Sequence, residues 1–269
     1  MAYRHPRVQR LRRLIGRRNA RAAEGCFVVE GSKVLGVALD AGVPVESVYV
    51  DPDLVHAGDR VEPLIDRCLA AGARVFYLSE GVLSRVAGTV TPQPVLAVVA
   101  TTDLTVDELG ARHPDLVVVC VDVRDPGNAG AVLRAAEAAG AGGVVACGAS
   151  VDLFNPKTVR ASAGAVFHVP TVTSPAASEV LDVVGRWGLR RLGTVARAGE
   201  DYAATDLTGP VAVVVGNEAW GLRPALDACL DVRVTIPMAG RAESLNVGMA
   251  AAVVCFEAAR QRRIGRVGR

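Results

Sequence analysis

Residues 116–140 read LVVVCVDVRDPGNAGAVLRAAEAAG, and this stretch decides the fold class. Its first eight residues form a continuous apolar, β-branched run, typical of a strand that a parallel sheet buries on both faces. Pro126 and Gly127 end the strand, and Asn128 suits the N-cap of a helix. An apolar stripe at helical spacing follows, formed by Val132, Ala135, Ala136 and Ala139. The stretch therefore predicts a strand, a tight turn and an amphipathic helix.

Arg134 interrupts this alanine-rich helix on the face opposite the apolar stripe. We expect it to face away from the core, either as a solvated arginine paired with Glu137 or as a functional residue. A dinucleotide-binding turn is a weaker interpretation. Its fingerprint needs a third glycine where the spacing from Gly127 and Gly130 places Leu133.

Apolar runs and helical patterns alternate along the whole chain, which predicts an α/β fold. The expected strands span residues 27–29, 47–50, 74–78, 95–100, 116–123, 143–147, 165–169, 190–195, 211–215 and 232–236. The clearest expected helices span residues 32–40, 61–71, 80–86 and 244–262. We expect a basic N-terminal helix with a small α/β domain over residues 1–104, a linker over 105–115, and a second domain over 116–269.

The composition excludes several classes of protein. Hydrophobic residues make up 51% of the 269 residues and aromatic residues only 4%, so the core should consist of Ala, Val and Leu. No apolar run has the length of a membrane span, and the Arg-rich start lacks the apolar centre of a signal peptide, so we expect a cytoplasmic protein. The six cysteines form no C-x-x-C pair and the four histidines are scattered, which favours reduced, buried thiols and no metal centre.

Positive charge is concentrated at both ends of the chain. Residues 1–25 hold eight arginines and one acidic residue, and the last ten residues hold five arginines and no acidic residue. From Val8 the apolar residues are spaced as one helical face, which leaves the arginines as a stripe able to follow the phosphates of a polyanion. For the C-terminal end, a solvated tail is the equally simple interpretation.

Three segments of the second domain, taken in order, closely resemble one family. They are NAGAVLR (128–134), VVVGNEAWGL (213–222) and IPMAGRAESLNVGMAAAVVCFE (236–257). They resemble the three motifs of the SpoU (TrmH) family of SPOUT RNA ribose 2'-O-methyltransferases. NPKTVRASAGAVFHVP (155–170) is similar to the stretch between the first two motifs, and FVVEG (27–31) looks like the start of the small ribosomal-protein-like RNA-binding domain of many members. One departure is Ala219, which stands where the second motif usually has glycine.

The resemblance implies a SPOUT methyltransferase domain with a deep trefoil knot, homodimerisation that forms the active site, and S-adenosylmethionine as cofactor. The cofactor contacts that it implies are Thr194, Gly216, Ile236, Pro237, Met238 and Leu245. Glycine at position 216 would let the backbone approach the cofactor, and residues 236–238 would offer main-chain hydrogen bonds beside an apolar wall. Core packing is the other interpretation of Ile236 and Leu245.

The resemblance also assigns the catalytic group. Arg134 matches the catalytic arginine of the family, and because guanidinium stays charged, we expect it to clamp a phosphate and stabilise the developing alkoxide. Asn128 and Glu218 would orient the arginine or the ribose, and Ser244 and Asn246 would complete the site. Asn128 and Ser244 are equally suited to cap helices.

The expected RNA contacts follow the basic helix and the stretch between the first two motifs. They are Arg10, Arg13, Arg17, Arg18, Arg160 and Ser162, with Lys157 as a further candidate. A separate N-terminal domain of ribosomal-protein type favours ribosomal RNA, and some ribosomal members of the family confer antibiotic resistance. The alternatives are a transfer RNA methyltransferase, an inactive RNA-binding scaffold and, disfavoured by the missing fingerprint, an NAD-dependent enzyme.

Overall fold

The computed structural model describes residues 1–56, 61–87, 91–174 and 176–267. Contacts between residues divide the chain into two units, and each unit consists of two separate segments of the sequence. The first unit contains residues 1–102 and 154–167, and the second contains residues 103–153 and 168–269. The chain therefore passes from one unit to the other three times. The segment 105–115, expected as a linker, belongs to the second unit.

The first unit contains a four-stranded sheet in the order β1-β4-β2-β3. Strand β1 pairs antiparallel with β4, β4 antiparallel with β2, and β2 parallel with β3. Its elements are α1 (Pro6–Gly16), α2 (Arg18–Glu24), β1 (Cys26–Glu30), α3 (Ser32–Asp40), β2 (Val45–Val50), η1 (Pro52–Leu54), α4 (Val61–Ala70), β3 (Arg74–Tyr77), α5 (Val82–Ala87), β4 (Val95–Ala100), α8 (Pro156–Ala161) and η2 (Ala165–Phe167).

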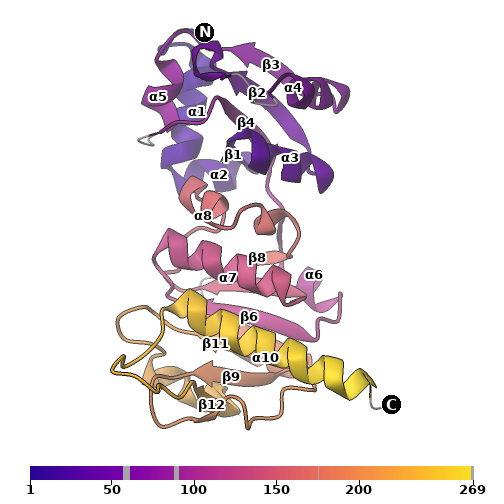
Figure 1. The fold of residues 1–269 in the computed structure, drawn as a ribbon, viewed down its shortest axis with the longest axis vertical. Coiled ribbons are helices and arrows are strands. Elements are labelled where there is room, and N and C mark those ends of the chain that lie inside the picture. Colours follow the sequence, from indigo (N-terminus) through magenta and orange to yellow (C-terminus); the bar gives the residue numbers. More distant parts are fainter. Residues whose placement is uncertain (57–60, 88–90, 175, 268–269) are drawn as a thin grey trace. The chain divides into compact units, whose positions relative to one another are not determined.

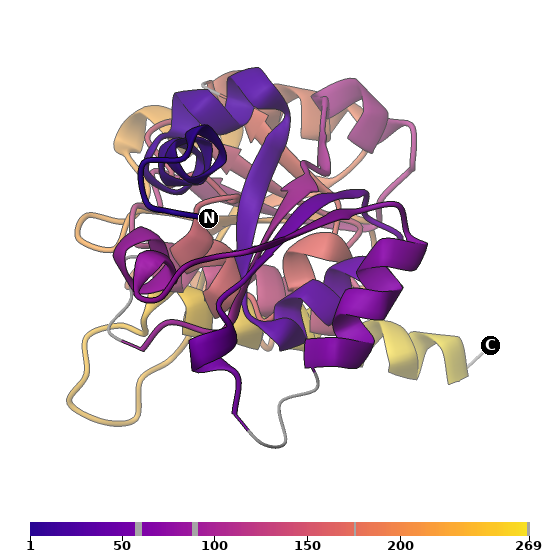
Figure 2. The ribbon, with the colours of Figure 1, turned by 90° about the horizontal axis from the view of Figure 1, so that it is seen from above.

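Helix α1 packs on one face of this sheet through the apolar side chains that the sequence spaces along one helical face. Val8, Leu11 and Leu14 are fully buried and join a core cluster with residues of α5 and of the strands. The predicted apolar face of the N-terminal helix is therefore confirmed. Helices α3 and α4 contact the strands and each other, and Figure 2 shows them on the opposite side of the sheet from α1. The sheet is thus covered on both faces.

The segment 154–167 belongs to the first unit because aromatic rings hold it there. The ring of Phe27 in β1 lies 4.9 Å from that of Phe154 and 6.0 Å from that of Phe167. The expected strand over 165–169 is wrong: residues 165–167 form the 3-10 helix η2, and the strand comes later, at β8. Gly164 has a φ of +98° and the N–H of Phe167 donates to the Gly164 carbonyl, so the backbone turns where the apolar pattern suggested extension.

The second unit is an eight-stranded sheet in the order β10-β12-β9-β11-β6-β7-β8-β5, with every pairing parallel. Its elements are β5 (Asp103–Leu104), α6 (Val106–Gly110), β6 (Leu116–Val121), α7 (Pro126–Ala138), β7 (Gly143–Cys147), β8 (Thr171–Ser174), α9 (Ala177–Arg186), β9 (Arg190–Thr194), β10 (Glu200–Asp201), β11 (Val211–Val215), η3 (Pro224–Cys229), β12 (Val232–Thr235) and α10 (Val247–Val267).

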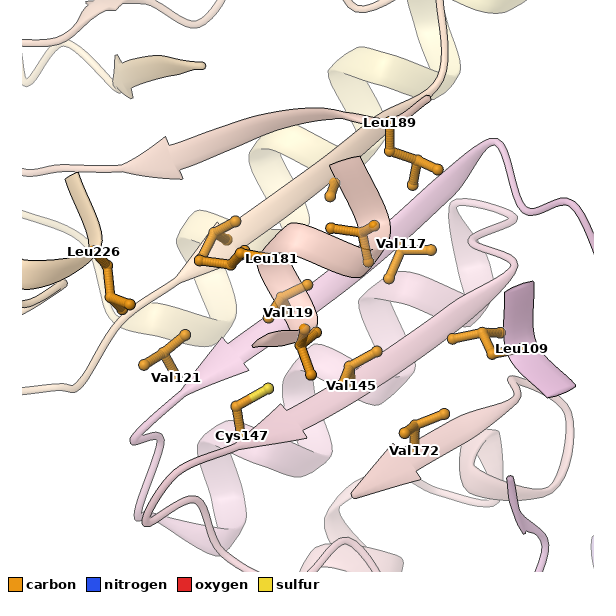
Figure 3. Close-up of a cluster of buried hydrophobic side chains, with 14 residues drawn as sticks. Leu109, Val117, Val119, Val121, Val145, Cys147, Val172, Leu181, Leu189 and Leu226 are labelled. Atoms are coloured by element: carbon orange, nitrogen blue, oxygen red, sulfur yellow. The ribbon is translucent and has the colours of Figure 1, made fainter. Parts of the chain in front are cut away.

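Helices cover both faces of this sheet, which explains why its central strands are apolar without alternation. Every residue of β6, β7 and β11 is buried. Figure 1 shows α7 and α10 side by side on one face, and these two helices contact each other closely. Helices α6 and α9 cover the other face, where Leu109, Val119 and Leu181 belong to one hydrophobic cluster (Figure 3). The predicted α/β class, with a buried parallel sheet, is confirmed.

Candidate active site

A pocket of about 620 Å³ opens at the carboxyl ends of three adjacent strands of the second unit, β12, β9 and β11. Parallel sheets commonly bind ligands in this position, because the loops that leave neighbouring strands there enclose a crevice. The pocket is lined by Asn128, Thr194, Val195, Ala196, Arg197, Gly216, Asn217, Glu218, Ala219, Trp220, Gly221, Leu222, Val234, Ile236, Met238, Glu243, Ser244, Leu245, Asn246, Val247 and Ala250.

The pocket contains most of the residues expected to bind a cofactor. Of the six, Thr194, Gly216, Ile236, Met238 and Leu245 line it, whereas Pro237 is exposed and does not. The hydroxyl of Thr194 donates to the carbonyl of Val214, which ties β9 to β11 at the pocket floor. Apolar and polar groups therefore share the wall, as in most small-molecule sites.

Gly216 is required by a close approach of two backbone segments. A Cβ atom at this position would lie 2.3 Å from the carbonyl carbon of Gly221 and 2.5 Å from the nitrogen of Leu222. Asn217 and Gly221 exchange backbone hydrogen bonds of 3.0 and 2.9 Å, which closes residues 217–221 into a tight loop. Ala219, the departure from the motif, is not among the non-glycine residues with positive φ, so alanine fits the backbone there.

Glu218 joins the loop after β11 to the start of α7. Its carboxylate accepts hydrogen bonds from the backbone N–H groups of Arg124 (3.2 Å) and Asp125 (3.0 Å) and from the side-chain amide of Asn128 (3.0 Å). Burial raises the pKa of Glu218, but the donors from Asn128 and the backbone together outweigh burial and hold the pKa below its ordinary value. The carboxylate is thus an ionised anchor that positions the first turn of α7.

Asn246 extends this network to the last helix. Its Nδ2 donates to Oδ1 of Asn128 over 2.7 Å, while its Oδ1 accepts from the N–H groups of Gly248 and Met249. Asn246 therefore caps α10 and orients Asn128 at the same time. Ser244, the alternative cap that the sequence suggested, lies before the helix and is exposed at the pocket wall.

Asn128 is not the N-cap of α7. That role belongs to Asp125, whose carboxylate accepts from the Asn128 N–H, and the helix begins one residue later at Pro126. The prediction placed the cap three residues too late, because both Asp and Asn suit an N-cap. The side chain of Asn128 is consequently free of the capping role and lies between Glu218 and Asn246.

Arg134 lies on the exposed face of α7, as expected, but it is not among the pocket-lining residues. Within the part of the chain that the structure describes, its guanidinium has no hydrogen bond or ion pair. The pairing with Glu137 that the sequence allowed is therefore not formed. A charged group without a structural partner is available to a ligand or to another chain.

The expected RNA contacts on α1 and α2 differ in how accessible they are. Arg10 pairs with Glu24 and Glu46 at 2.6 Å each, and its side chain is only 27% exposed. Its hydrogen bond to Glu46 raises the pKa of Arg10 and lowers that of Glu46. Arg13 is more open, at 55% exposure. Arg17 and Arg18 are exposed as well, so these three fit a phosphate contact better than Arg10.

Arg21 shows that not every arginine of the basic end faces solvent. It is 4% exposed and donates to the carbonyls of Leu14 and Ile15 at the end of α1, which satisfies two acceptors that the helix leaves open. Arg12, which the sequence reasoning passed over, is exposed and lies 4.9 Å from the ring of Tyr3. Arginine beside aromatic rings in a basic surface is the signal that would have identified it.

Two expected RNA contacts lie on the segment 154–167. Arg160 is 42% exposed and pairs over 2.9 Å with Glu30, whose side chain is 4% exposed. Ser162 is 1% exposed and its hydroxyl donates to the carbonyl of Val159, which weighs against a contact with RNA. Lys157 is exposed at the start of α8.

The basic C-terminal end belongs largely to α10. Arg260 pairs with Glu257, and Arg262 donates to the carbonyls of Asp115, Leu207 and Gly209, so this part is not a free tail. The side chains of residues 266–269 lie outside the described residues. Arg260 and Arg262 therefore help to fix the last helix.

The described residues were also compared with the requirements of a membrane span, a metal site and a reactive cysteine. No described helix has both the length and the apolar character needed to cross a membrane. Among the same residues, no group of three or more His, Cys, Asp or Glu side chains is placed to hold a metal ion. All six cysteines are free and five are buried; burial raises the pKa of Cys147 and Cys255 to about 12.

Comparison with protein families identifies the chain. Residues 115–256 match the model of the SpoU rRNA Methylase family, and residues 5–97 match the MRM3-like substrate binding domain. The chain is a member of the SpoU family. The first match covers more than half of the chain and contains every residue that lines the pocket.

Relatives of this SpoU-family chain are similar over nearly its whole length. The 23S rRNA (uridine(2479)-2'-O)-methyltransferase of Streptomyces viridochromogenes is 33% identical over 271 residues, which cover 98% of this chain and 92% of the relative. The 23S rRNA (guanosine(2553)-2'-O)-methyltransferase RlmP of Bacillus subtilis (strain 168) is 33% identical over 236 residues, which cover 88% of this chain and 89% of the relative.

Solved structures agree with the same assignment to the SpoU family. The SpoU methyltransferase AviRb from Streptomyces viridochromogenes, in complex with the cofactor AdoMet, is 32% identical with a TM-score of 0.82. The match covers 97% of this chain and 100% of the AviRb chain. An AdoMet-bound rRNA methyltransferase from Sinorhizobium meliloti is 31% identical with a TM-score of 0.82, covering 95% of each chain.

Asn246→Asp is expected to separate the two tasks of Asn246 in this SpoU-family site. Aspartate caps a helix as well as asparagine, so the melting temperature should stay within about a degree of wild type. The amide donor to Asn128 is lost, and the rate of methyl transfer should fall about three- to tenfold, the worth of one hydrogen bond. Thermal unfolding and single-turnover methyl transfer measure the two effects. A wild-type rate would show that the bond to Asn128 has no role in the reaction.

The lowered pKa of Glu218 predicts a pH dependence of stability. A carboxyl group whose folded pKa lies below its unfolded value stabilises the fold above the unfolded pKa of about 4.3, and this stabilisation disappears as the pH falls through the folded value. Glu218→Gln should therefore lower the melting temperature at pH 7 and have progressively less effect below about pH 4. A constant difference between pH 7 and pH 3 would contradict this.

Proposed function

We propose that this chain methylates the 2'-hydroxyl of a ribose in ribosomal RNA, with S-adenosylmethionine as the methyl donor. The observation that carries the proposal is that one pocket collects residues of all three motifs. Asn128 comes from the first motif and residues 216–222 come from the second; Ile236, Met238 and residues 243–247 come from the third. The two relatives described above, both named as 23S ribosomal RNA 2'-O-methyltransferases, support the substrate class.

The pocket suits S-adenosylmethionine in size and in the character of its walls. Its volume of about 620 Å³ lies within the range of small-molecule sites. Ile236 and Leu245 offer an apolar wall for an adenine ring, and the loop closed by Gly216 brings backbone groups to the pocket edge. When bound, S-adenosylmethionine supplies a methyl group on a positively charged sulfur. The protein's own task is to place a ribose oxygen in line with that methyl group.

The network of Asn246, Asn128 and Glu218 provides the rigid edge against which the ribose is placed. Each amide has a fixed direction because it donates to the next member of the chain of hydrogen bonds. Arg134 clamps a phosphate beside the target ribose and stabilises the negative charge that develops on the 2'-oxygen. The 2'-hydroxyl proton leaves to water or to another acceptor, because a guanidinium stays protonated.

We also propose that two copies of the chain complete the site. Helix α10 exposes Met249 (61%), Phe256 (47%) and Ile264 (60%), whose spacing of seven and eight residues puts them on one helical face. Arg134, on the neighbouring helix α7, does not line the pocket of its own chain. Dimerisation through this apolar face would bring the arginine of one copy to the pocket of the other. The deep trefoil knot implied by the family belongs to the same proposal.

The dimer is tested by light scattering and by one substitution. We expect twice the chain mass of 27.9 kDa for the wild-type protein. Phe256→Glu places a charge in the apolar face, so it should give a folded monomer with little methyl transfer. Glu137→Gln, an exposed change on α7, is the control that should stay dimeric. A fully active monomer would overturn the shared site.

The function is tested by mapping ribose methylation in total RNA from cells with and without this gene. A single ribosomal site should lose its methyl group on deletion, regain it with the wild-type gene, and stay unmethylated with Arg134→Ala. Loss of a methyl group from transfer RNA instead would favour the transfer RNA alternative. No change in any RNA, together with intact S-adenosylmethionine binding by the purified protein, would favour an RNA-binding scaffold. We also propose that the reaction takes place in the cytoplasm.

A further inference from the structure

Trp220 is an exposed aromatic residue at the edge of the pocket. It lines the pocket wall, yet 48% of its surface is open to solvent. The other tryptophan, Trp187, packs against the hydrophobic cluster under the sheet. A large aromatic side chain left in water beside a binding pocket is more informative than a scattered surface leucine, because it offers a π-face to a ligand.

The loop that carries Trp220 is held rigidly, so the exposure of the ring is built into the fold. Asn217 and Gly221 exchange backbone hydrogen bonds on either side of it, and the N–H of Ala219 donates to the side chain of Asn217 over 2.8 Å. Glu218 binds the backbone of residues 124 and 125. The tryptophan is therefore presented by a braced turn, and its position needs no reordering when a ligand binds.

Two arginines contact the indole ring of Trp220. The guanidinium carbon of Arg124 lies 5.2 Å from the ring centroid and that of Arg223 lies 5.8 Å away. Arg223 is also 3.3 Å from a carboxylate oxygen of Asp122, and its side chain is 60% exposed. Both distances fall within the range of cation–π contacts, which hold the guanidiniums over the ring, and both arginine side chains are exposed to solvent. Positive charge and an open aromatic surface thus occur together.

We propose that Trp220, Arg124 and Arg223 form a nucleotide platform at the pocket mouth. The indole stacks on one base of the substrate RNA, and the two guanidiniums contact the phosphates on either side of that base. The proposal deepens the proposed function and rests on it, because the RNA strand must approach this pocket for its ribose to be methylated. Aromatic rings flanked by arginine recognise splayed-out bases in single-stranded RNA regions. Stacking accepts every base, so this platform grips the strand and leaves base selection to other contacts.

A protein partner is the less favoured occupant of this surface. A protein interface buries several apolar side chains around its centre. Here one exposed aromatic ring lies in contact with two exposed cations, a combination suited to the bases and phosphates of an RNA strand.

The first experiment compares Trp220→Leu with Trp220→Phe in steady-state methyl transfer to an unmodified 23S ribosomal RNA transcript. One stacked base corresponds to a change of about 5- to 150-fold, so Trp220→Leu should raise KM for RNA within this range. Trp220→Phe keeps a ring and should raise it less. The Kd for S-adenosylmethionine should not change in either variant. A weaker Kd for the cofactor with an unchanged KM for RNA would instead make Trp220 part of the cofactor wall.

Salt dependence separates the stacking ring from the charged groups. Trp220→Leu should weaken RNA binding equally at every salt concentration, because stacking releases no counterions. Arg124→Gln and Arg223→Gln should each lower the slope of log Kd against log salt by about 0.7 to 1. Arg186→Gln, an exposed arginine at the end of α9, should leave the slope unchanged.

Tryptophan fluorescence reports the contact directly in the folded wild-type protein. The transcript should quench the wild-type signal, and Trp220→Phe, which keeps only Trp187, should lose this response. If the wild-type protein methylates the transcript and Trp220→Leu has the wild-type KM for RNA, the nucleotide platform is overturned while the proposed function stands. A wild-type protein that methylates no RNA would overturn the proposed function first. Quenching by a protein fraction but not by RNA would assign the surface to a protein partner.

Discussion

Arg134→Lys should lower the rate of methyl transfer about 10²- to 10³-fold, the usual effect of removing one donor that stabilises developing negative charge. Lysine keeps the charge but loses the planar, two-pronged donor that grips a phosphate and an adjacent oxygen together. The fold should be unaffected, because Arg134 is exposed and has no partner within the described chain. The measurement is single-turnover methyl transfer at saturating ribosomal RNA.

Two controls make the Arg134 result specific. The Kd for S-adenosylmethionine should stay at the wild-type value, because the proposed contacts of Arg134 are a phosphate and the 2'-oxygen of the RNA and not the cofactor. Arg186→Lys changes another exposed arginine, on α9, and should methylate at the wild-type rate. Turnover of Arg134→Lys within a few-fold of wild type would show that a point charge suffices, and the phosphate clamp would have to be abandoned.

Gly216→Ala is expected to have the largest effect on cofactor binding. The new Cβ would lie 2.3 Å from the carbonyl carbon of Gly221, 2.5 Å from its oxygen and 2.5 Å from the nitrogen of Leu222. All three neighbours are backbone atoms, so the strain cannot be relieved by a side-chain rotation. Overpacking of this kind costs about 1–3 kcal/mol, which lowers the melting temperature by roughly 2–12 °C in a chain of this size.

Moving the loop of residues 217–221 would displace the pocket wall that contains Glu218 and Leu222. We therefore expect the affinity of Gly216→Ala for S-adenosylmethionine to fall about tenfold or more, measured by calorimetry beside thermal unfolding. Gly209→Ala is the matched control, because no atom lies within 4 Å of the Cβ it would add. Wild-type affinity and melting temperature in Gly216→Ala would mean that the loop moves aside without cost.

The sequence predicted the local elements that rest on periodicity. Residues 32–40 form a helix and residues 95–100, 143–147 and 211–215 form strands with the expected bounds. The expected strand over 165–169 failed because Phe167 is drawn to Phe27, a contact between residues far apart in sequence. No local pattern carries that information.

In the candidate site, too, the sequence predicted individual residues but not the contacts between residues far apart in the chain. The motifs indicated Asn128, Glu218 and Asn246, yet only the structure shows that their side chains form one chain of hydrogen bonds. Arg10 was expected to contact RNA, and Arg21 was counted in the positive charge of the N-terminal end. Glu46 and the end of α1 hold them instead, partners that charge counting does not reveal.

The three passages of the chain between its two units also limit how this protein can be recombined. A chimera that exchanges residues 1–102 for the same region of a relative would keep the native segment 154–167. Its Phe154 and Phe167 would then meet a foreign residue in place of Phe27, and Arg160 a foreign partner in place of Glu30. The first unit of this protein therefore includes a short internal segment, and a transplant at a single junction would transfer only part of the unit.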